Sequence, residues 1–463
     1  MAPMTGQLPD VGASGNGDTP DDADVVIIGG GPAGAVAGYV LATLGHSTVV
    51  LEKAAFPRFH IGESTVPYLT RLFDLIGLLE PVEHGPFVHK HGVELTWSNG
   101  DSFRARFSYL SAGQRPLAFN FDRTQMDELL LRHAEHAGAH VLQEAVVDEL
   151  VFDGDRLAGV RYRTLAGRGE VRSRFVIDAS GRAGVISRRL GRRKMNRRLR
   201  NIAVFQQFTG LDPATNPSVP GDQVVGSHRE GWVWAIPLSA DVLSVGTVMS
   251  VERLKGRDPE AVFADYIGRV PRIRQRLEGG TTIFDKVKIE ADYCYHTETL
   301  AGPGYFVIGD AGCFVDPLFS GGFYFGAVGA YTAATAISDV LSGGDEETAR
   351  RTFSNFMKTA YDGYFRLAYG FYEGCRANFG RVFEYYPGFV PFGIEVLCGD
   401  FWGQPGHPTL DFLRSNPDWA TFEEPFERVI GCPYYAGSDP ATTPIRRPWA
   451  EKKAREPVAP RSS

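Results

Sequence analysis

The sequence predicts an α/β fold in which an antiparallel sheet is inserted into a parallel one and a helical region follows both. Three observations predict this architecture. Residues 25–53 form a compact strand–helix–strand pattern. Apolar strand patterns return much later, at 175–181 and 305–310, as expected when distant segments join one buried parallel sheet. Between these two, segments 244–250 and 286–296 alternate apolar and polar residues, which is typical of half-buried strands.

Composition places the chain among ordinary globular proteins. Its 463 residues are 43% hydrophobic and 22% charged, enough for one large core or two joined lobes. The net charge of -7 gives no general reason to expect nucleic-acid binding. No apolar run reaches the ~20 residues that a membrane-spanning helix needs. Five scattered cysteines without a C-x-x-C pair favour neither a disulfide framework nor a zinc site, and predict a cytoplasmic protein.

The two ends of the chain are expected to be disordered tails. Residues 1–23 lack the basic and apolar regions of a secretory signal. Residues 439–463 are rich in Pro and Arg. We therefore expect the folded part to comprise a core over 24–345 and a helical region over 346–438.

The first strand–helix–strand unit carries a dinucleotide-binding pattern. Gly29, Gly31 and Gly34 form G-x-G-x-x-G after the strand 25–28. The first glycine permits a tight turn, the second lets the backbone approach a pyrophosphate, and the third lets helix and strand pack closely. The helix from about Pro32 to Leu44 points its N-terminus at that pyrophosphate. Glu52 closes the second strand, where it can bind ribose hydroxyls.

The two later strands indicate which dinucleotide. Segment 175–181 ends in Asp178, and segment 305–322 contains Gly309 and Asp310 at a strand end, where an acid can bind the ribityl hydroxyls of a flavin. From about 24 to 345 the chain resembles the FAD-dependent monooxygenases of the hydroxybenzoate-hydroxylase type. In that superfamily the helix that Arg123 begins reaches the FAD. The alternative for 121–141 is a plain amphipathic helix.

Three further motifs resemble those of flavin-dependent halogenases. Segment 56–67 contains P-R-x-x-x-G-E-S, which in those enzymes passes beside the flavin. In segment 87–95, Lys90 stands two residues before a glycine, where those enzymes carry an essential lysine. Trp232 and Trp234 belong to W-x-W-x-I-P, the signature of this family.

The resemblance implies a set of cofactor-binding residues and a reaction. The FAD-binding residues are expected to be Gly29, Gly31, Pro32, Ala33, Gly34, Glu52, Lys53, Arg58, Glu63, Ser64, Arg123, Asp178, Gly309 and Asp310. FADH2, delivered by a separate flavin reductase, reacts with O2 to a flavin hydroperoxide, and chloride or bromide then yields hypohalous acid. A separate reductase is expected because the chain has no second nucleotide fingerprint.

The same resemblance implies that the oxidant travels to a substrate held apart from the flavin. Trp232 and Trp234 would enforce the separation by excluding substrate and water. Lys90 would receive the oxidant, as a haloamine or through a hydrogen bond, and desolvation would lower its pKa. The alternative is that the two indoles are ordinary core packing and that Lys90 is a solvated side chain.

The segment 316–322, DPLFSGG, is expected to bind halide. Ser320, Gly321 and Gly322 open a helix whose backbone N–H groups can bind an anion, and similar halogenases place chloride at such glycines. The alternative is a tight turn with no ligand. Tryptophan halogenases carry a glutamate where this chain has Phe319, so the chain looks like the phenol and pyrrole halogenases.

The remaining segments support this interpretation without narrowing it. Residues 96–120 and 200–300 are expected to form the antiparallel substrate sheet, and the aromatic-rich region after 350 to cap an aromatic substrate or to be core. Segment 182–201 holds nine basic residues, either a solvated surface or a dock for an acidic acyl- or peptidyl-carrier protein that presents the substrate. His84, His89 and His91 lack the pattern of a metal site.

Three rival functions stay open on the sequence. An FAD-dependent aromatic hydroxylase or epoxidase would consume NAD(P)H itself and ignore halide. A reductase that saturates prenyl chains would need a lipid tunnel and no oxygen. A flavin-binding protein without chemistry is disfavoured by the intact glycines, Lys90 and both tryptophans.

Overall fold

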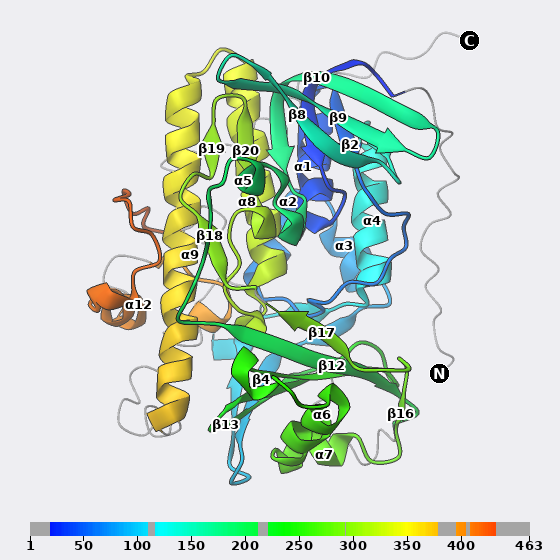
Figure 1. The fold of residues 1–463 in the computed structure, drawn as a ribbon. Coiled ribbons are helices and arrows are strands. Elements are labelled where there is room, and N and C mark those ends of the chain that lie inside the picture. The colour runs from blue at the N-terminus through cyan, green and yellow to red at the C-terminus, as the bar shows by residue number, and fades with distance from the viewer. Residues whose placement is uncertain are drawn as a thin grey trace.

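A computed structural model describes residues 19–109, 116–211, 221–291, 293–377, 395–403 and 408–431. The chain forms two lobes, each built on one large sheet, and the long helix α9 (Glu346–Ala377) runs beside both (Figure 1). This arrangement confirms the predicted α/β fold class with a second, largely antiparallel sheet.

The first lobe is built on a sheet in the order β19-β20-β10-β1-β2-β7, with β8 and β9 extending it beside β10. Its strands are β1 (Asp22–Ile28), β2 (Thr48–Leu51), β7 (His140–Leu142), β8 (Val146–Asp153), β9 (Arg156–Thr164), β10 (Gly167–Asp178), β19 (Ala301–Gly302) and β20 (Tyr305–Val307). Strands β1, β2, β7, β10 and β20 pair in parallel. The N-terminal, middle and late segments of the chain therefore meet in one sheet, as the apolar runs predicted.

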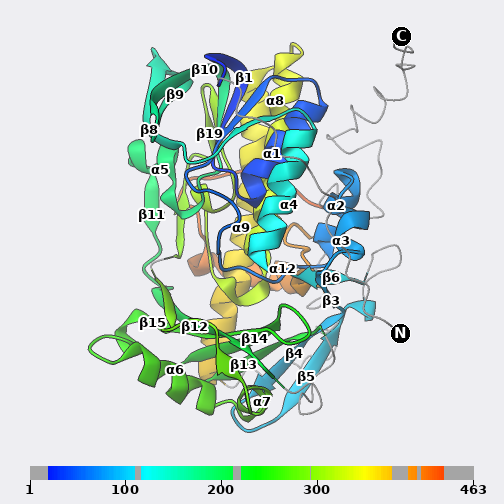
Figure 2. The same ribbon diagram turned by 90° about the vertical axis from the view of Figure 1, so that its right-hand side faces the viewer.

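Among the described residues, six helices belong to this lobe and pack around its sheet. They are α1 (Pro32–Thr43), α2 (Tyr68–Leu75), α3 (Leu79–Glu83), α4 (Arg123–His136), α5 (Val185–Arg189) and α8 (Gly321–Leu341). Helix α1 packs against both α4 and α8, because small residues such as Gly38 and Ala37 let the helices approach closely. Figure 2 shows α1 between α4 and the yellow α8.

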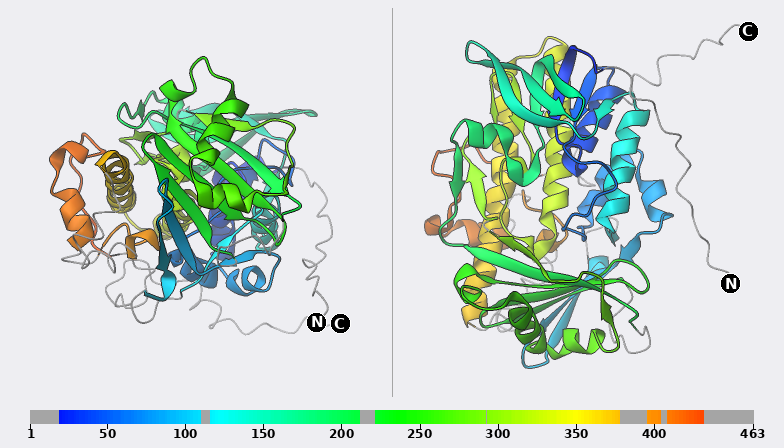
Figure 3. Two further views of the ribbon diagram at one scale, coloured as in Figure 1. Left: turned by 90° about the horizontal axis from the view of Figure 1, so that it is seen from below. Right: turned by 45° about the vertical axis from the view of Figure 1, so that its right-hand side comes forward.

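The second lobe is a sheet in the order β16-β12-β15-β14-β13-β4-β5, with β17 also on β12. Its strands are β4 (Gly92–Trp97), β5 (Ser102–Arg106), β12 (Asn201–Thr209), β13 (Gln223–His228), β14 (Gly231–Pro237), β15 (Leu243–Ser250), β16 (Thr281–Thr282) and β17 (Lys288–Ala291). Every pair is antiparallel except β4 with β13. Two helices, α6 (Pro259–Gly268) and α7 (Pro271–Arg276), cover the outer face, as the view from below shows (Figure 3).

The structure differs from the expected elements in four places. Segment 87–95 is not one strand but two, β3 (Val88–Lys90) and β4, because the chain leaves the first pairing after Lys90. Strand β6 (Ala118–Asn120) pairs with β3 rather than with the large sheet. Helices α6 and α7 lie within the range expected to be strands. Strand β1 begins at Asp22, inside the range expected to be a tail.

Smaller elements complete the chain. A two-stranded sheet joins β11 (Arg193–Met195) to β18 (Tyr295–Thr297), and α12 (Pro408–Arg414) packs on α9. Of the expected tails 1–23 and 439–463, residues 1–18 and 439–463 lie outside the described residues, as do residues 378–394 of the aromatic-rich segment.

Candidate active site

Three glycines shape the turn between β1 and α1 into an open cradle. Gly29 has a φ of +102°, and a Cβ there would lie 2.6 Å from the Ala179 carbonyl oxygen. A Cβ on Gly34 would lie 1.8 Å from the Gly29 carbonyl oxygen. A Cβ on Gly31 would meet only the Arg58 guanidinium, at 3.3 Å. The turn is therefore tightly packed at Gly29 and Gly34 but has room at Gly31, beside the N-terminus of α1. This shape fits a pyrophosphate.

The start of α1 has the geometry of an anion-binding helix N-terminus. Gly31 caps the helix without a side-chain hydrogen bond, and Pro32 occupies its first turn. The Cβ of Ala33 lies 3.4 Å from where a Cβ of Gly326 on α8 would stand. The first turn of α1 is thus held against α8 and keeps its N–H groups for a ligand.

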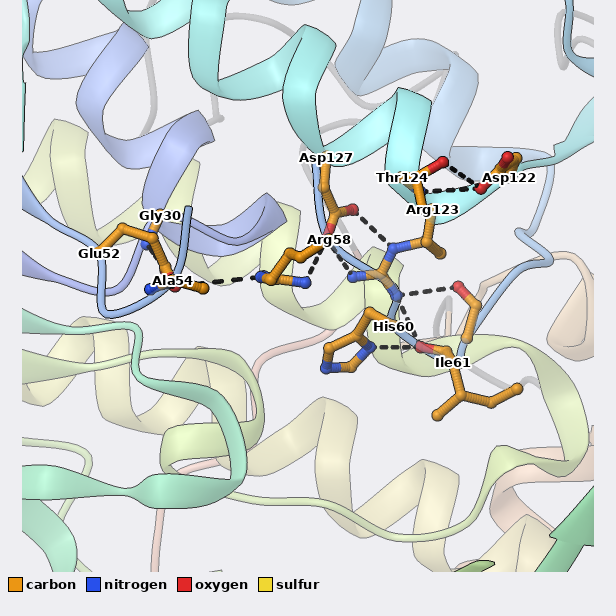
Figure 4. Close-up of polar contacts among 11 residues, drawn as sticks. Gly30, Glu52, Ala54, Arg58, His60, Ile61, Asp122, Arg123, Thr124 and Asp127 are labelled. Atoms are coloured by element: carbon orange, nitrogen blue, oxygen red, sulfur yellow. Dashed lines mark hydrogen bonds and ion pairs between the residues drawn. The ribbon is translucent and has the colours of Figure 1, made fainter. Parts of the chain in front are cut away.

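Glu52 and Arg58 border this cradle (Figure 4). Glu52 is buried at the end of β2, and its carboxylate accepts hydrogen bonds from the N–H groups of Gly30 at 2.6 Å and Ala54 at 2.9 Å. The Arg58 Nε lies 3.9 Å from Glu52 Oε1. Arg58 therefore bridges from the cradle to the neighbouring helix α4 through Asp127.

Asp127 on α4 joins two arginines into one network (Figure 4). Its carboxylate is fully buried and pairs with Arg123 at 2.6 and 2.8 Å and with Arg58 at 3.2 Å. Arg123 Nη1 also donates to the carbonyls of Ile61 at 2.8 Å and Gly62 at 3.1 Å. Arg123 thus starts α4, as expected, and holds the segment that leads to Glu63 and Ser64.

Asp178 lies at the end of β10, but its carboxylate is fully engaged. The side chain is 0% exposed and accepts hydrogen bonds from Ser180 N and Oγ and from Ile186 N. It therefore holds the turn after β10, and a direct contact with a cofactor stays a prediction. Lys53, in contrast, is exposed next to Glu52.

Lys90 has the environment of an activated amine. Its side chain is 1% exposed, and burial lowers its pKa from 10.5 to about 7. The Nζ atom donates to Ser64 Oγ at 3.0 Å and to the Thr65 carbonyl oxygen at 2.8 Å. Ser64 Oγ in turn donates to Asn120 at 2.7 Å, so its oxygen is oriented to accept from Lys90. Lys90 is therefore not the solvated lysine of the alternative interpretation.

Glu63 connects this segment to the second lobe. Its carboxylate accepts hydrogen bonds from Ser244 Oγ on β15 and from Gln207 Nε2 on β12, both at 2.7 Å. Burial raises the pKa of Glu63 to about 7, although both hydrogen bonds oppose the rise. The residue thus ties the segment beside the cradle to the antiparallel sheet.

Both tryptophans project from one face of β14 into one cluster. Trp232 is 2% and Trp234 5% exposed, with ring centroids 5.6 Å apart. A Cβ on Gly246 of β15 would lie 2.2 Å from the Trp234 ring, so only glycine lets that indole lie across the strand. Their cluster includes Phe107, whose ring the Lys90 Nζ faces at 5.6 Å. The structure therefore gathers Lys90 and both indoles around one aromatic region.

The segment 316–322 forms a strained turn into α8. Ser320 has a φ of 57° and lies between a 3-10 turn and the helix, without a capping hydrogen bond of its own to the helix. A Cβ on Gly321 would meet the rings of Phe325 and Tyr364 at 3.0 Å. A non-glycine residue in this backbone region is uncommon and is a reason to suspect function.

A small cavity lies beside this turn. Its volume is about 10 Å³, room for a single water molecule, and Gly322, Asp310 and Asp316 are among its lining residues. Gly309, which precedes Asp310, has a φ of +55° and packs against α8 at Gly326. The acid after β20 and the proposed halide turn thus border the same space.

Several residues of this site escaped the sequence analysis. Asp127 could have been found, because it follows Arg123 at helical i, i+4 spacing. Asn120, Ser244 and Gln207 carry no such signal, since only the pairing of distant strands brings them to Ser64 and Glu63. The hydrogen bonds of Asp316 to Asn201 on β12 and to Tyr372 on α9 also join parts of the chain that are distant in sequence.

The basic segment 182–201 is largely engaged within the chain. Six of its nine basic side chains make contacts to other parts of the chain or to each other: Arg182, Arg188, Arg192, Arg193, Lys194 and Arg198. Arg189, Arg197 and Arg200 are exposed. A carrier-protein dock would therefore have fewer charges than the sequence suggested.

The described residues contain neither a candidate membrane span nor a candidate metal cluster. Across those ranges no helix combines the length and hydropathy needed to cross a membrane. Nor do the same ranges contain three His, Cys, Asp or Glu side chains grouped to hold a metal ion.

Two protein families and several known halogenases match the chain. The FAD dependent oxidoreductase family matches residues 24–190, and the tryptophan halogenase family matches residues 111–378. The chain is 33% identical over 384 residues to a flavin-dependent halogenase of Armillaria mellea, covering 78% of this chain and 76% of that enzyme. It is 33% identical to the sulochrin halogenase of Aspergillus terreus, covering 75% and 68%. A tryptophan 2-halogenase of Chondromyces crocatus is 33% identical, covering 75% and 66%.

Solved structures show the same fold. The flavin-dependent brominase Bmp2 superposes with a TM-score of 0.77 at 26% identity, covering 85% of this chain and 98% of that one. The myxobacterial chondrochloren halogenase CndH superposes with a TM-score of 0.70 at 31% identity, covering 76% and 82%.

The fold is that of an FAD-dependent oxidoreductase. Within that class the chain belongs to the flavin-dependent halogenases, in the tryptophan halogenase family. It is an enzyme that uses FAD to halogenate an aromatic compound, with halide and O2 as the general co-substrates of its family. The hydroxylase, reductase and non-enzymatic alternatives are thereby set aside.

Proposed function

We propose that this halogenase installs chloride or bromide on an electron-rich phenol or pyrrole and that Lys90 carries the oxidant to it. The observation that carries the proposal is the buried Lys90 amine, whose pKa is lowered to about 7. Membership of the halogenase family supports the halogenation of an aromatic compound. The roles of individual residues and the choice of a phenol or pyrrole are what we propose.

Reduced FAD, when bound, supplies hypohalous acid from O2 and halide. In its neutral form the Lys90 amine has two N–H groups and one lone pair. Ser64 Oγ and the Thr65 carbonyl accept the two N–H groups, so the lone pair is left for the oxidant. The amine can displace hydroxide from hypohalous acid to form a haloamine and water, or hold the acid by a hydrogen bond.

Trp232 and Trp234 are proposed to wall off the flavin from the substrate. Two buried indoles in contact fill a large volume and exclude water from the path of the oxidant. Ser320, Gly321 and Gly322 are proposed to hold the halide through N–H groups at the N-terminus of α8.

The proposed FAD site comprises the cradle and its border. Gly29, Gly31, Pro32, Ala33 and Gly34 would hold the pyrophosphate, because a Cβ at Gly31 would meet only the Arg58 guanidinium and the turn has room on that side. A second group would contact the rest of the cofactor: Glu52, Lys53, Arg58, Glu63, Ser64, Arg123, Asp178, Gly309 and Asp310. Of these, Arg58 and Asp310 border open space, whereas Asp178 is proposed to act through the turn it holds.

Phe319 favours the phenol or pyrrole class. It stands where the sequence resemblance places a glutamate in tryptophan halogenases, and its ring packs against Tyr364 and Phe371 at centroid distances of 6.3 and 6.0 Å. No carboxylate therefore stands at this position to assist a poorly activated ring. Electron-rich phenols and pyrroles need less assistance.

The experiment supplies the protein with FAD, a flavin reductase, NADH, O2 and bromide or chloride, and a panel of phenols, pyrroles and free tryptophan. Mass spectrometry follows the products of wild type, Lys90→Ala and Lys255→Ala, an exposed lysine that serves as the control. We expect a halogen isotope pattern on a phenol or pyrrole that disappears only in Lys90→Ala. Halogenation of tryptophan alone, or full activity of Lys90→Ala, would contradict the proposal.

Carrier presentation is the remaining part of the proposal. The exposed Arg189, Arg197 and Arg200 would meet an acidic carrier protein by charge complementarity. Changing all three to Glu should then lower turnover of a carrier-bound phenol or pyrrole but leave turnover of the free compound unchanged. Equal turnover of the carrier-bound substrate by wild type and variant would exclude this dock.

A further inference from the structure

Trp232 is linked to the segment 316–322 through a side chain of α9. The indole Nε1–H of Trp232 donates to the Tyr372 hydroxyl at 2.8 Å. The Tyr372 hydroxyl donates to Asp316 Oδ2 at 2.9 Å. The three residues come from β14, from α9 and from the start of the proposed halide segment, three parts of the chain that are far apart in sequence.

Asp316 organises its own segment at the same time. Its side chain is 1% exposed, Oδ1 accepts the Leu318 N–H at 3.1 Å, and Oδ2 also accepts Asn201 Nδ2 at 3.2 Å. Its backbone carbonyl accepts the Tyr364 hydroxyl at 2.6 Å. The Asp316 carboxylate thus holds the turn that leads to Ser320 and, through Tyr372, also holds the Trp232 indole.

The two indoles differ in what holds them. Trp234 donates to Ser244 Oγ at 3.3 Å, and Ser244 donates to Glu63 beside the proposed flavin segment. Only Trp232 is linked to the segment 316–322 by side-chain hydrogen bonds. A buried indole N–H without a partner would cost free energy, so this link selects one orientation of the ring.

We propose that Tyr372 and Asp316 are positioning residues that hold Trp232 against the halide turn, and that they thereby keep the oxidant on its path to the substrate. The inference rests on the proposed function, in which the turn binds halide and Trp232 is a wall. In this proposal both residues act through Trp232 and the turn, and not on the reacting atoms. Loss of the link leaves the indole free to turn, and oxidant then escapes as free hypohalous acid.

The test compares Tyr372→Phe with Tyr364→Phe. Both variants remove one phenol hydroxyl from α9 that donates to Asp316, but only Tyr372 connects the carboxylate to Trp232. Hypohalous acid that leaves the enzyme is trapped with monochlorodimedone, and the ratio of trapped oxidant to halogenated aromatic is measured over a range of halide concentrations. We expect the ratio to rise about fivefold or more in Tyr372→Phe, the value of one hydrogen bond, and to stay near wild type in Tyr364→Phe.

A second readout does not depend on activity. Hydrogen exchange of the Trp232 indole N–H is followed by NMR in the full-length protein, with Trp232→Phe used to assign the signal. Protection should fall in Tyr372→Phe and Asp316→Asn and persist in Tyr364→Phe. Unchanged protection in Tyr372→Phe, or an equal rise of the leakage ratio in both tyrosine variants, would overturn the inference. A wild type that halogenates nothing would instead refute the proposed function, and the exchange measurement would still judge the link.

Discussion

The Lys90 Nζ lies 3.0 Å from Ser64 Oγ in the protein interior, and Thr65, the next residue after Ser64, supplies the second acceptor, a backbone carbonyl oxygen and not a carboxylate. Burial lowers the pKa of Lys90, and the charge of Asp222, the largest influence that raises this pKa, does not outweigh it. An amine in such a place is neutral for much of its population near neutral pH. The first two predictions follow from this relationship.

The first prediction concerns the reactivity of Lys90. Its amine should titrate near pH 7, because burial disfavours the ammonium form. Competitive labelling with acetic anhydride at several pH values, followed by peptide mass spectrometry, measures that pKa directly. In Ser64→Ala the pKa should fall further, because an acceptor that stabilises the ammonium is lost. A Lys90 that titrates near 10.5 in wild type would contradict the assignment.

The second prediction concerns stability and pH. The unfolded chain binds a proton on Lys90 below about 10.5, whereas the folded chain binds it only below about 7. Between these values the free energy of unfolding of wild type should rise with pH relative to Lys90→Met, by about 1.4 kcal/mol per pH unit. Urea titrations from pH 7 to 10 measure the difference, and a difference that does not change with pH would count against a depressed pKa.

The third prediction concerns Glu63, for which the free energy of unfolding should change with pH in the opposite direction. Burial raises the pKa of Glu63 from 4.5 to about 7, so between these values the folded chain holds a proton that the unfolded chain has lost. Relative to Glu63→Gln, wild type should therefore lose stability as pH rises through this window, by about 1.4 kcal/mol per pH unit at most. The same urea titrations from pH 5 to 7 check it. Parallel curves for the two proteins would show that Glu63 is ionised throughout.

The fourth prediction separates two glycines of the cradle. A Cβ at position 34 meets the Gly29 carbonyl oxygen at 1.8 Å, so Gly34→Ala should fail to fold or melt far below wild type. A Cβ at position 31 meets only the end of the Arg58 side chain at 3.3 Å, so Gly31→Ala should fold with a near-wild-type melting temperature. Its FAD affinity should fall, since the Cβ enters the space proposed for the pyrophosphate. Thermal melts and flavin-fluorescence titrations measure both effects, and unchanged FAD affinity in Gly31→Ala would place the pyrophosphate elsewhere.

Short sequence motifs predicted most of the fold and the protein family. The glycine turn, the helix after it and the start of α4 at Arg123 follow from short-range backbone and side-chain chemistry, and the structure has them where they were expected. The division of 87–95 into two strands was missed, because strand pairing depends on partners such as β6 and β13 that are far away in the sequence. Helices α6 and α7 lie within 200–300, which was expected to be sheet, although Pro259 and Pro271 stand in their first turns as local signals of a helix start.

The sequence by itself determined the α/β class, the dinucleotide cradle and the halogenase family, because each depends on residues close together in the chain. Only the tertiary structure decided the state of Lys90, because burial and the acceptors at Ser64 and Thr65 come from packing. It also decided that Asp178 is engaged by its own turn and that Trp232 reaches Asp316 through Tyr372. A pKa shift or a relay of hydrogen bonds depends on which distant groups exclude water from a side chain, and that is a property of the fold.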